Sequence, residues 1–238
     1  MTNATRARLN RDRVLAAAVA LADRDGLDAL SMRNLADHLD VVPMALYKHV
    51  ANKDELLDGV VDVILGEIDP PDEALAWRTA VRARILSARQ VLLRHPWARP
   101  VIESRTNRTP VVLGYMDSIA GAFIGGGLSA DLTHHVMHVL GNRMWGFSPE
   151  FFNEPGATTD ESIDLDDQQA MVREMAEQFP NIVQIVMAAT DGDPSRAGCD
   201  EQFEFEFALD LLLDGFERLH EAGWTSSKRR RHPRRGQG

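Results

Sequence analysis

GLDALSMRNLADHLDVVPMALYKHVANKDELLD, residues 26–58, is the stretch that decides the fold. Gly26 is placed to end a helix that the Ala- and Leu-rich segment 13–24 predicts, and Ser31 is placed to cap a second helix. Pro43 fits the first turn of a third, very short helix, PMALYKHV. Two short helices joined by three or four residues form a helix-turn-helix, which places its second helix in the major groove of DNA. From spacing alone, an ordinary helix pair of an α-protein is an equal alternative.

The same residues closely resemble the DNA-binding head of TetR-family transcriptional regulators. The matching features are Gly26, the SxRxLA pattern at 31–36, the LYxHVxNK pattern at 46–53 and the LLD at 56–58. Asp40 departs from the glycine that the family usually has in the turn, but Asp tolerates a left-handed backbone better than most residues. The resemblance implies a three-helix head and a sequence-specific transcriptional regulator, usually a repressor, rather than an enzyme.

The resemblance also implies roles for residues of the head. Ser31 and Lys53 match positions that contact phosphates, and Arg33 matches a position that reaches a base edge, where its guanidinium can bind guanine O6 and N7. The recognition helix adds Pro43, Met44 and Ala45, which offer apolar contact to a thymine methyl, and Tyr47, Lys48 and His49. Phosphate contact is the expected use of Tyr47 and Lys48, while packing is an equal alternative for His49.

Composition agrees with a helical, folded protein. The chain has 238 residues, of which 44% are hydrophobic, 26% charged and only 6% aromatic, which excludes disordered and collagen-like classes and favours helices. Cys199 is the single cysteine, so no internal disulfide or Cys₄ zinc site can form. No apolar run is long enough to span a membrane, and the N-terminus lacks the apolar segment of a signal peptide. We therefore expect an all-α protein located in the cytoplasm.

Charge is distributed unevenly along the chain. Residues 1–54 carry eight basic and seven acidic side chains, residues 55–227 carry 12 and 29, and residues 228–238 carry six and none. A polyanion is therefore repelled by the middle of the chain and accepted only at its ends. Acidic surfaces also simply keep proteins soluble, so charge alone does not decide the function.

Three segments are predicted. Residues 1–68 form the helix-turn-helix DNA-binding domain, residues 69–225 form a ligand-binding and dimerisation domain, and residues 226–238 form a disordered basic tail. Helices are expected at about 52–68, 77–94, 110–125, 129–147, 168–179, 181–190 and 201–222, with loops at 148–166 and 191–198. Pro96 and Pro100 are expected to break the chain into a short turn-rich piece.

The second segment resembles, more weakly, the C-terminal domain of the tetracycline-repressor type. The resemblance rests on WRxxVRxRxxSxRxxLLRHP at 77–96 and on a Ser-capped helix that ends in WGF at 145–147. It implies a homodimer held by helices near 129–147 and 201–222, and a small-molecule inducer. The last helix places Phe203, Phe207, Leu211 and Leu212 near one face, for which packing inside the same chain is an alternative to the dimer contact. Two heads fit the two half-sites of a pseudo-palindromic operator.

The resemblance also bears on the inducer. Where tetracycline repressors have metal-binding histidines, this chain has Ile68 or Asp69, Ile102 and Asn142. We therefore expect no metal and no cofactor, and a more apolar inducer. The wall residues predicted for its pocket are Arg84, Trp97, Ile102, Met116, Phe123, His138 and Trp145, and for each of them core packing, or solvation of Arg84, is an alternative.

One pattern favours a different chemistry. His134 and His138 stand at the i, i+4 spacing that can ligate zinc, but position 135 is His, where the HExxH motif has Glu. GxSxG, phosphate-loop and Rossmann patterns are absent from the sequence. A metal-dependent hydrolase on a helical bundle is therefore the weaker alternative. Stoichiometric metal in the purified protein would favour it.

Overall fold

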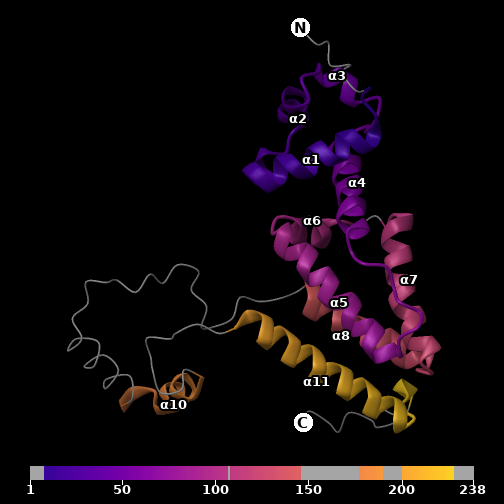
Figure 1. The fold of residues 1–238 in the computed structure, drawn as a ribbon, viewed down its shortest axis with the longest axis vertical. Coiled ribbons are helices and arrows are strands. Elements are labelled where there is room, and N and C mark those ends of the chain that lie inside the picture. Colours follow the sequence, from indigo (N-terminus) through magenta and orange to yellow (C-terminus); the bar gives the residue numbers. More distant parts are fainter. Residues whose placement is uncertain (1–7, 107, 146–176, 190–199, 228–238) are drawn as a thin grey trace, which may run out of the picture. The chain divides into compact units, whose positions relative to one another are not determined.

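The computed structural model describes residues 8–106, 108–145, 177–189 and 200–227, and within these ranges every regular element is a helix (Figure 1). The expected all-α fold is confirmed. The chain divides into two compact units, one made of residues 1–146 and 213–238 and the other of residues 147–212. The predicted boundary at 68–69 falls inside the first unit.

Four α-helices and one 3₁₀ turn form the head: α1 (Arg11–Asp25), η1 (Leu27–Ala29), α2 (Met32–His38), α3 (Pro43–Leu46) and α4 (Lys53–Gly66). Gly26 ends α1 at a φ of 82°. The side chains of Ser31 and Asn52 cap α2 and α4 by accepting backbone N–H groups at 3.1 and 2.8 Å. Leu35, Leu46 and Val50 are among the fully buried residues that hold α2 and α3 together. Local capping and a small apolar core therefore fix the helix-turn-helix.

The turn between α2 and α3 depends on Asp40. Its φ of 53° makes it the single non-glycine residue with a positive φ in the described part of the chain. The Asp40 and Val41 N–H groups donate to the carbonyls of Asp37 and Ala36 and close the end of α2. The expectation that Asp adopts the left-handed conformation here is confirmed. The helix after the turn is shorter than predicted, since α3 ends at Leu46.

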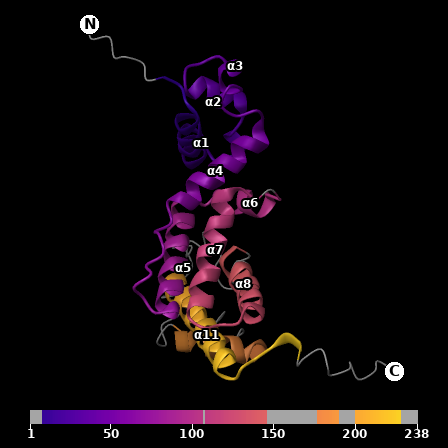
Figure 2. The same cartoon turned by 90° about the vertical axis from the view of Figure 1, so that its right-hand side faces the viewer.

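Helices α5 (Trp77–Arg94), α6 (Ala98–Ser104), α7 (Pro110–Gly125) and α8 (Ala130–Trp145) form the body. Helix α4 runs from the head into the body, where it contacts α6 and α7, and α7 also packs against α5 and α8 (Figure 2). The bounds of α5 and α7 are those predicted. The link between head and cavity is therefore a single continuous helix.

Helix α6 corrects the sequence interpretation. The segment around Pro96 and Pro100 was expected to be turn-rich, but Pro100 lies in the first turn of α6. Proline is tolerated there because the first N–H groups of a helix have no intrahelical partner. The two prolines thus mark the start of a helix, and this helix carries part of the cavity wall.

An aromatic cluster closes the far end of the body. Phe123 is fully buried, with its ring centroid 5.6 Å from that of Trp77 and 6.3 Å from that of Phe216. A Cβ atom at Gly126 would lie 2.4 Å from Trp77, so this close approach requires glycine. Arg78 pairs with Asp214 and Glu217 and so ties α5 to the end of the last helix.

The remaining described helices are α10 (Pro180–Ala189) and α11 (Glu201–Glu221). Helix α11 buries Phe205, Leu209, Leu213 and Phe216 and leaves Phe203, Phe207 and Leu211 exposed. Leu212, predicted on the same face as these three, is half-buried. The predicted loops at 148–166 and 191–198, most of the helix at 168–179 and tail residues 228–238 lie outside the described residues. Ser226, the predicted start of the tail, donates two hydrogen bonds to Asp131.

Among the helices of the described ranges, none is both long and apolar enough to cross a membrane.

Candidate nucleic-acid interface and ligand cavity

The first turn of α2 carries two of the predicted DNA contacts. The Ser31 Oγ accepts the Asn34 N–H at 3.1 Å, which leaves its hydroxyl hydrogen available to donate. Arg33 is exposed, and no ion pair holds its guanidinium within the described part of the chain. Arg33 is thus free to reach a ligand in solution from the first turn of α2.

The start of α3 is unusually apolar for an exposed surface. Met44 is 71% exposed and Val42, the residue before Pro43, is 69% exposed. Tyr47 and Lys48 are also exposed, while Ala45 and His49 are half-buried. Leu46 and Val50 are buried in the core. An exposed apolar surface at the start of α3 is suited to contact the methyl groups of thymines in the major groove.

Sequence reasoning missed Val42. A residue before a proline is expected to have an extended backbone. The sequence around Val42 does not show whether its side chain is exposed or buried in the core. Only the exposure at the N-cap of α3 shows that Val42 belongs to the same surface as Pro43 and Met44.

Lys53 stands at the first position of α4, where it is exposed. The cap beneath it is doubled, because Asn52 accepts the Glu55 N–H while the Glu55 carboxylate accepts the Ala51 N–H at 2.7 Å. The backbone that carries Lys53 is therefore held firmly. All nine predicted DNA residues lie in the described head, and the residues of this set are hereafter called the head surface: Ser31, Arg33, Pro43, Met44, Ala45, Tyr47, Lys48, His49 and Lys53.

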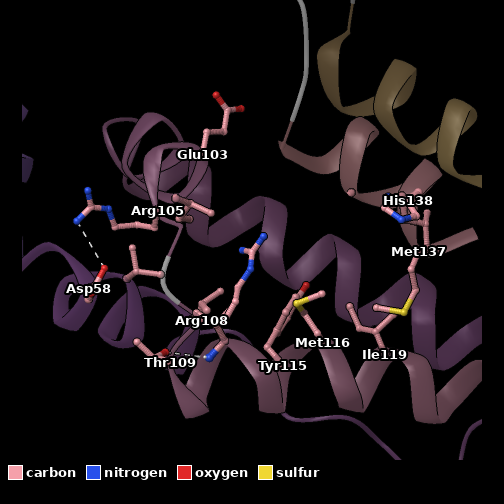
Figure 3. A pocket seen from close by; sticks show the side chains of 16 residues that line it. Asp58, Glu103, Arg105, Arg108, Thr109, Tyr115, Met116, Ile119, Met137 and His138 are labelled. Carbon is pink, nitrogen blue, oxygen red and sulfur yellow. Dashed lines mark hydrogen bonds and ion pairs between the residues drawn. The ribbon is translucent and has the colours of Figure 1, made fainter. Parts of the chain in front are cut away.

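The body contains a cavity of about 390 Å³ between α4, α6, α7 and α8 (Figure 3). Its wall is mostly apolar, with a few charged and polar groups at one side. The lining residues are Asp58, Val61, Leu65, Ile102, Glu103, Arg105, Arg108, Thr109, Val112, Tyr115, Met116, Ile119, Met137, His138, Leu140 and Gly141. Such a volume, with few polar groups in an apolar wall, is typical of small-molecule sites.

The structure brings three of the predicted wall residues together at this cavity: Ile102, Met116 and His138. Phe123 lies instead in the aromatic cluster, and Trp97 donates from its indole N–H to Asp23 of α1 at 2.6 Å. Arg84 lies behind the wall, with its guanidinium 5.0 Å from the ring centroid of Tyr115. The side chain of Trp145 lies outside the described residues.

Sequence reasoning missed the charged side of the cavity. Arg105 and Arg108 follow α6 in a segment that contains no recognisable motif. Asp58 belongs to the LLD pattern at 56–58, which gives no sign that it lines a cavity. Tyr115 is buried against the wall, and burial raises the pKa of its hydroxyl well above the usual range, so the ring stays neutral. No local pattern distinguishes Tyr115 from an ordinary core residue.

The segment from α6 to α7 holds the cavity-facing side of α4. Arg105 pairs with Asp54 at 3.0 Å and with Asp58 at 3.5 Å, and Thr109 hydrogen-bonds Asp62. Asp58, Arg105 and Thr109 also line the cavity. An occupant of the cavity therefore touches the groups that fix the position of α4, which carries Lys53 at its other end.

A second set of contacts ties the head to the body. Asp23 of α1 accepts from His95 Nδ1 at 2.7 Å and from Trp97. Glu67, directly after α4, accepts from Arg94 at 2.9 Å and lies 3.2 Å from His95 Nε2. Partial burial raises the pKa of Glu67, but these hydrogen bonds outweigh it and lower the pKa below its usual value.

The described residues hold no group of three or more His, Cys, Asp and Glu side chains arranged as metal ligands. The His134 and His138 rings lie 4.7 Å apart on an exposed face of α8. His135 packs instead against Trp224, with ring centroids 5.3 Å apart.

Comparison with known families divides the chain in two. Residues 14–60 match the family "Bacterial regulatory proteins, tetR family", and residues 69–220 match "Tetracyclin repressor-like, C-terminal domain". The second match alone covers more than half of the chain. The head surface lies within the first match and most of the cavity lies within the second.

Curated relatives carry the same kind of description. An HTH-type transcriptional regulator of Saccharopolyspora erythraea is 39% identical over 124 residues, which is 52% of each chain, so this match spans about half of that relative's length. The HTH-type transcriptional repressor DrrR1 of Streptomyces coeruleorubidus is 28% identical over 214 residues, covering 89% of this chain and 78% of the repressor.

Two solved structures show a ligand or DNA. ActR of Streptomyces coelicolor in complex with actinorhodin superposes with a TM-score of 0.67 at 27% identity, covering 89% of this chain and 96% of ActR. BioQ with its double-stranded DNA operator superposes with a TM-score of 0.59 at 25% identity, covering 89% of this chain and 99% of BioQ.

Proposed function

Because the chain belongs to the tetR family of bacterial regulatory proteins, we propose that it is a sequence-specific DNA-binding transcriptional repressor that a small organic molecule releases from its operator. It is a regulator and not an enzyme. The observation that carries the proposal is a single helix, α4, which presents Lys53 at the head surface and lines the cavity with Asp58, Val61 and Leu65.

The head surface reads operator DNA in two ways. Arg33 makes a bidentate contact with guanine in the major groove, and the exposed apolar start of α3 contacts thymine methyl groups. Ser31, Tyr47, Lys48 and Lys53 hold phosphates and set the register without reading sequence. The structure of BioQ with its operator supports this use of a related head.

The regulator acts as a homodimer on a pseudo-palindromic operator. Helix α11 supports this proposal, because it buries one apolar face and exposes a second one formed by Phe203, Phe207 and Leu211. Phe203 and Phe207 stack with ring centroids 6.2 Å apart. A contiguous stripe of large apolar side chains is typical of an interaction surface, and a second copy of the same helix would cover it symmetrically.

The ligand changes the distance between the two heads. Without a ligand, Arg105 pairs with Asp58 of α4 and Thr109 hydrogen-bonds Asp62 of α4. Occupancy of the cavity favours other positions of Arg105 and Thr109. Helix α4 then tilts, and the head surface moves with it. The shift is limited by the difference in ligand affinity between the two states. The complex of ActR with actinorhodin supports a small-molecule occupant in a related body. We infer that no metal or cofactor takes part and that the protein acts in the cytoplasm, where its operator lies.

Selection from random duplex DNA by the full-length protein tests the proposal. The expected result is an enriched pseudo-palindrome with two half-sites in successive major grooves. Binding that remains equal for all sequences after several rounds would overturn the proposed function.

A further inference from the structure

The charged groups of the cavity wall are nearly all neutralised by neighbours. Arg105 pairs with Asp54 and Asp58, and Glu103 accepts a hydrogen bond from Arg99 at 3.0 Å, one helical turn away. Arg108 differs from them, because among the described residues it has no ion pair. Figure 3 shows Arg105 directed toward Asp58, whereas Arg108 points away from that pair. Arg108 is exposed to solvent at the cavity wall, so within the described residues the wall carries one arginine whose charge no acidic side chain offsets.

A second unmatched cation lies behind the wall. Among the described residues, the Nε and Nη1 atoms of Arg84 are buried without a hydrogen-bond partner, and its Nη2 lies 3.4 Å from the Ser118 hydroxyl. A guanidinium keeps its charge under all ordinary conditions. Arg84 therefore adds positive potential behind Tyr115, whose ring it faces at 5.0 Å.

The rest of the wall favours a flat, polarisable occupant. Met116 and Met137 contribute thioethers, and Tyr115 contributes an aromatic ring. Methionine sulfur makes favourable contacts with aromatic rings, and aliphatic side chains such as Val112 and Ile119 complete the apolar surface. A neutral apolar ligand would fill this wall but would leave Arg108 unmatched.

We propose that the cavity selects aromatic organic anions, with the aromatic body packed between Met116, Met137 and Tyr115 and a carboxylate bound by Arg108. A guanidinium binds a carboxylate through two parallel N–H···O bonds, which gives direction as well as affinity. The proposal rests on the proposed function, since it names the chemical class of the ligand that the regulator senses.

Calorimetric titration with 2-naphthoate and with its uncharged amide, 2-naphthamide, tests the proposal on the full-length protein. The two probes share the aromatic body and differ in charge. The wild type is expected to bind the acid at least about tenfold more tightly than the amide. Arg108→Gln should weaken naphthoate binding by about tenfold and leave naphthamide binding within about twofold. Arg108→Lys should recover part of the preference because it keeps the charge.

Two further variants locate the effect. Gly141 lines the cavity, and a Cβ atom added to it would have no neighbouring atom within 4 Å. Met137, which also lines the cavity, lies one turn earlier on the same face of α8. Gly141→Leu should therefore fill part of the cavity and weaken both probes. Arg24→Gln, which removes an exposed arginine of the head, is the matched control and should change neither affinity.

Equal affinity of the wild type for acid and amide, failure of both probes to bind, or an acid preference that survives in Arg108→Gln would each overturn the proposal. Operator release measured in parallel separates this inference from the proposed function. Naphthoate that binds through Arg108 without releasing DNA contradicts the inducer role and leaves the anion preference standing. Release by the amide alone contradicts the anion preference and leaves the inducer role standing.

Discussion

The head and the cavity are built in opposite ways. In the head, short-range caps at Ser31 and Asn52 fix the starts of α2 and α4, the helices enclose fully buried leucines, and the functional residues project outward from this base. The cavity lies between four helices that meet only in the tertiary structure, and its functional residues face inward toward unfilled space. The head is therefore suited to present a fixed surface, and the cavity is suited to change when it is filled.

The largest expected effect tests this contrast in rigidity. Leu35 is fully buried in the head, whereas Met116 in the cavity wall is 40% exposed. Leu35→Ala should lower the free energy of unfolding of the head by about 2–5 kcal/mol, and Met116→Ala should lower that of the body by less than about 1 kcal/mol. Urea unfolding followed by circular dichroism measures both. Equal losses would show that the two regions are packed alike.

The dimer doubles the head surface, so its disruption should affect DNA binding more than ligand binding. Phe207→Glu places a charge in the exposed apolar stripe of α11 and should weaken dimerisation by about 2–4 kcal/mol. Phe207→Leu keeps the stripe apolar and serves as the control. Sedimentation analysis measures the change. A wild-type monomer at micromolar concentration, or a Phe207→Glu dimer as strong as the wild type, would contradict the assignment of this face.

Within the head surface, base reading and phosphate binding can be separated. Arg33→Ala should cost about 1–3 kcal/mol of operator binding and relax the preference at one base pair of each half-site. Lys53→Ala should weaken all sequences equally and flatten the dependence of affinity on salt. Fluorescence anisotropy with the selected operator and a scrambled duplex gives both results. An unchanged preference in Arg33→Ala would remove its base-reading role.

The smallest expected effect concerns the turn of the helix-turn-helix. Asp40 has a φ of 53°, which costs a side chain with a Cβ about 1 kcal/mol unless local hydrogen bonds offset it. Asp40→Ala should therefore destabilise the head by about 1 kcal/mol, and Asp40→Gly should be within about 0.5 kcal/mol of the wild type. Thermal unfolding measures the difference. Similar losses in both variants would mean that the Asp40 side chain, and not its backbone, holds the turn.

The same contrast explains what the sequence could predict. The caps at Ser31 and Asn52, the stop at Gly26 and the turn at Asp40 were predictable because each depends on residues close in the chain. The residues of the head surface were assigned through the family resemblance, and Val42 was missed because a valine in a sequence gives no sign of its exposure.

The cavity wall was harder to predict because its residue types also build cores. Phe123 and Trp97 looked like wall residues, but one packs in the aromatic cluster and the other hydrogen-bonds Asp23. Arg108 lines the wall from the short segment after α6, a helix that forms where two prolines indicated a break. Neither hydrophobic periodicity nor a motif in a single sequence shows which apolar helix faces enclose a cavity instead of packing against each other.

The change in operator affinity on filling the cavity tests the central claim most directly. The selected operator is titrated by anisotropy with and without an aromatic acid that binds the cavity, in the presence and absence of a metal chelator. The acid is expected to weaken operator binding equally with and without the chelator, and Gly141→Leu is expected to lose this response. Operator affinity unchanged by a bound acid would show that the cavity does not control the head, and release that requires magnesium would show that a metal takes part.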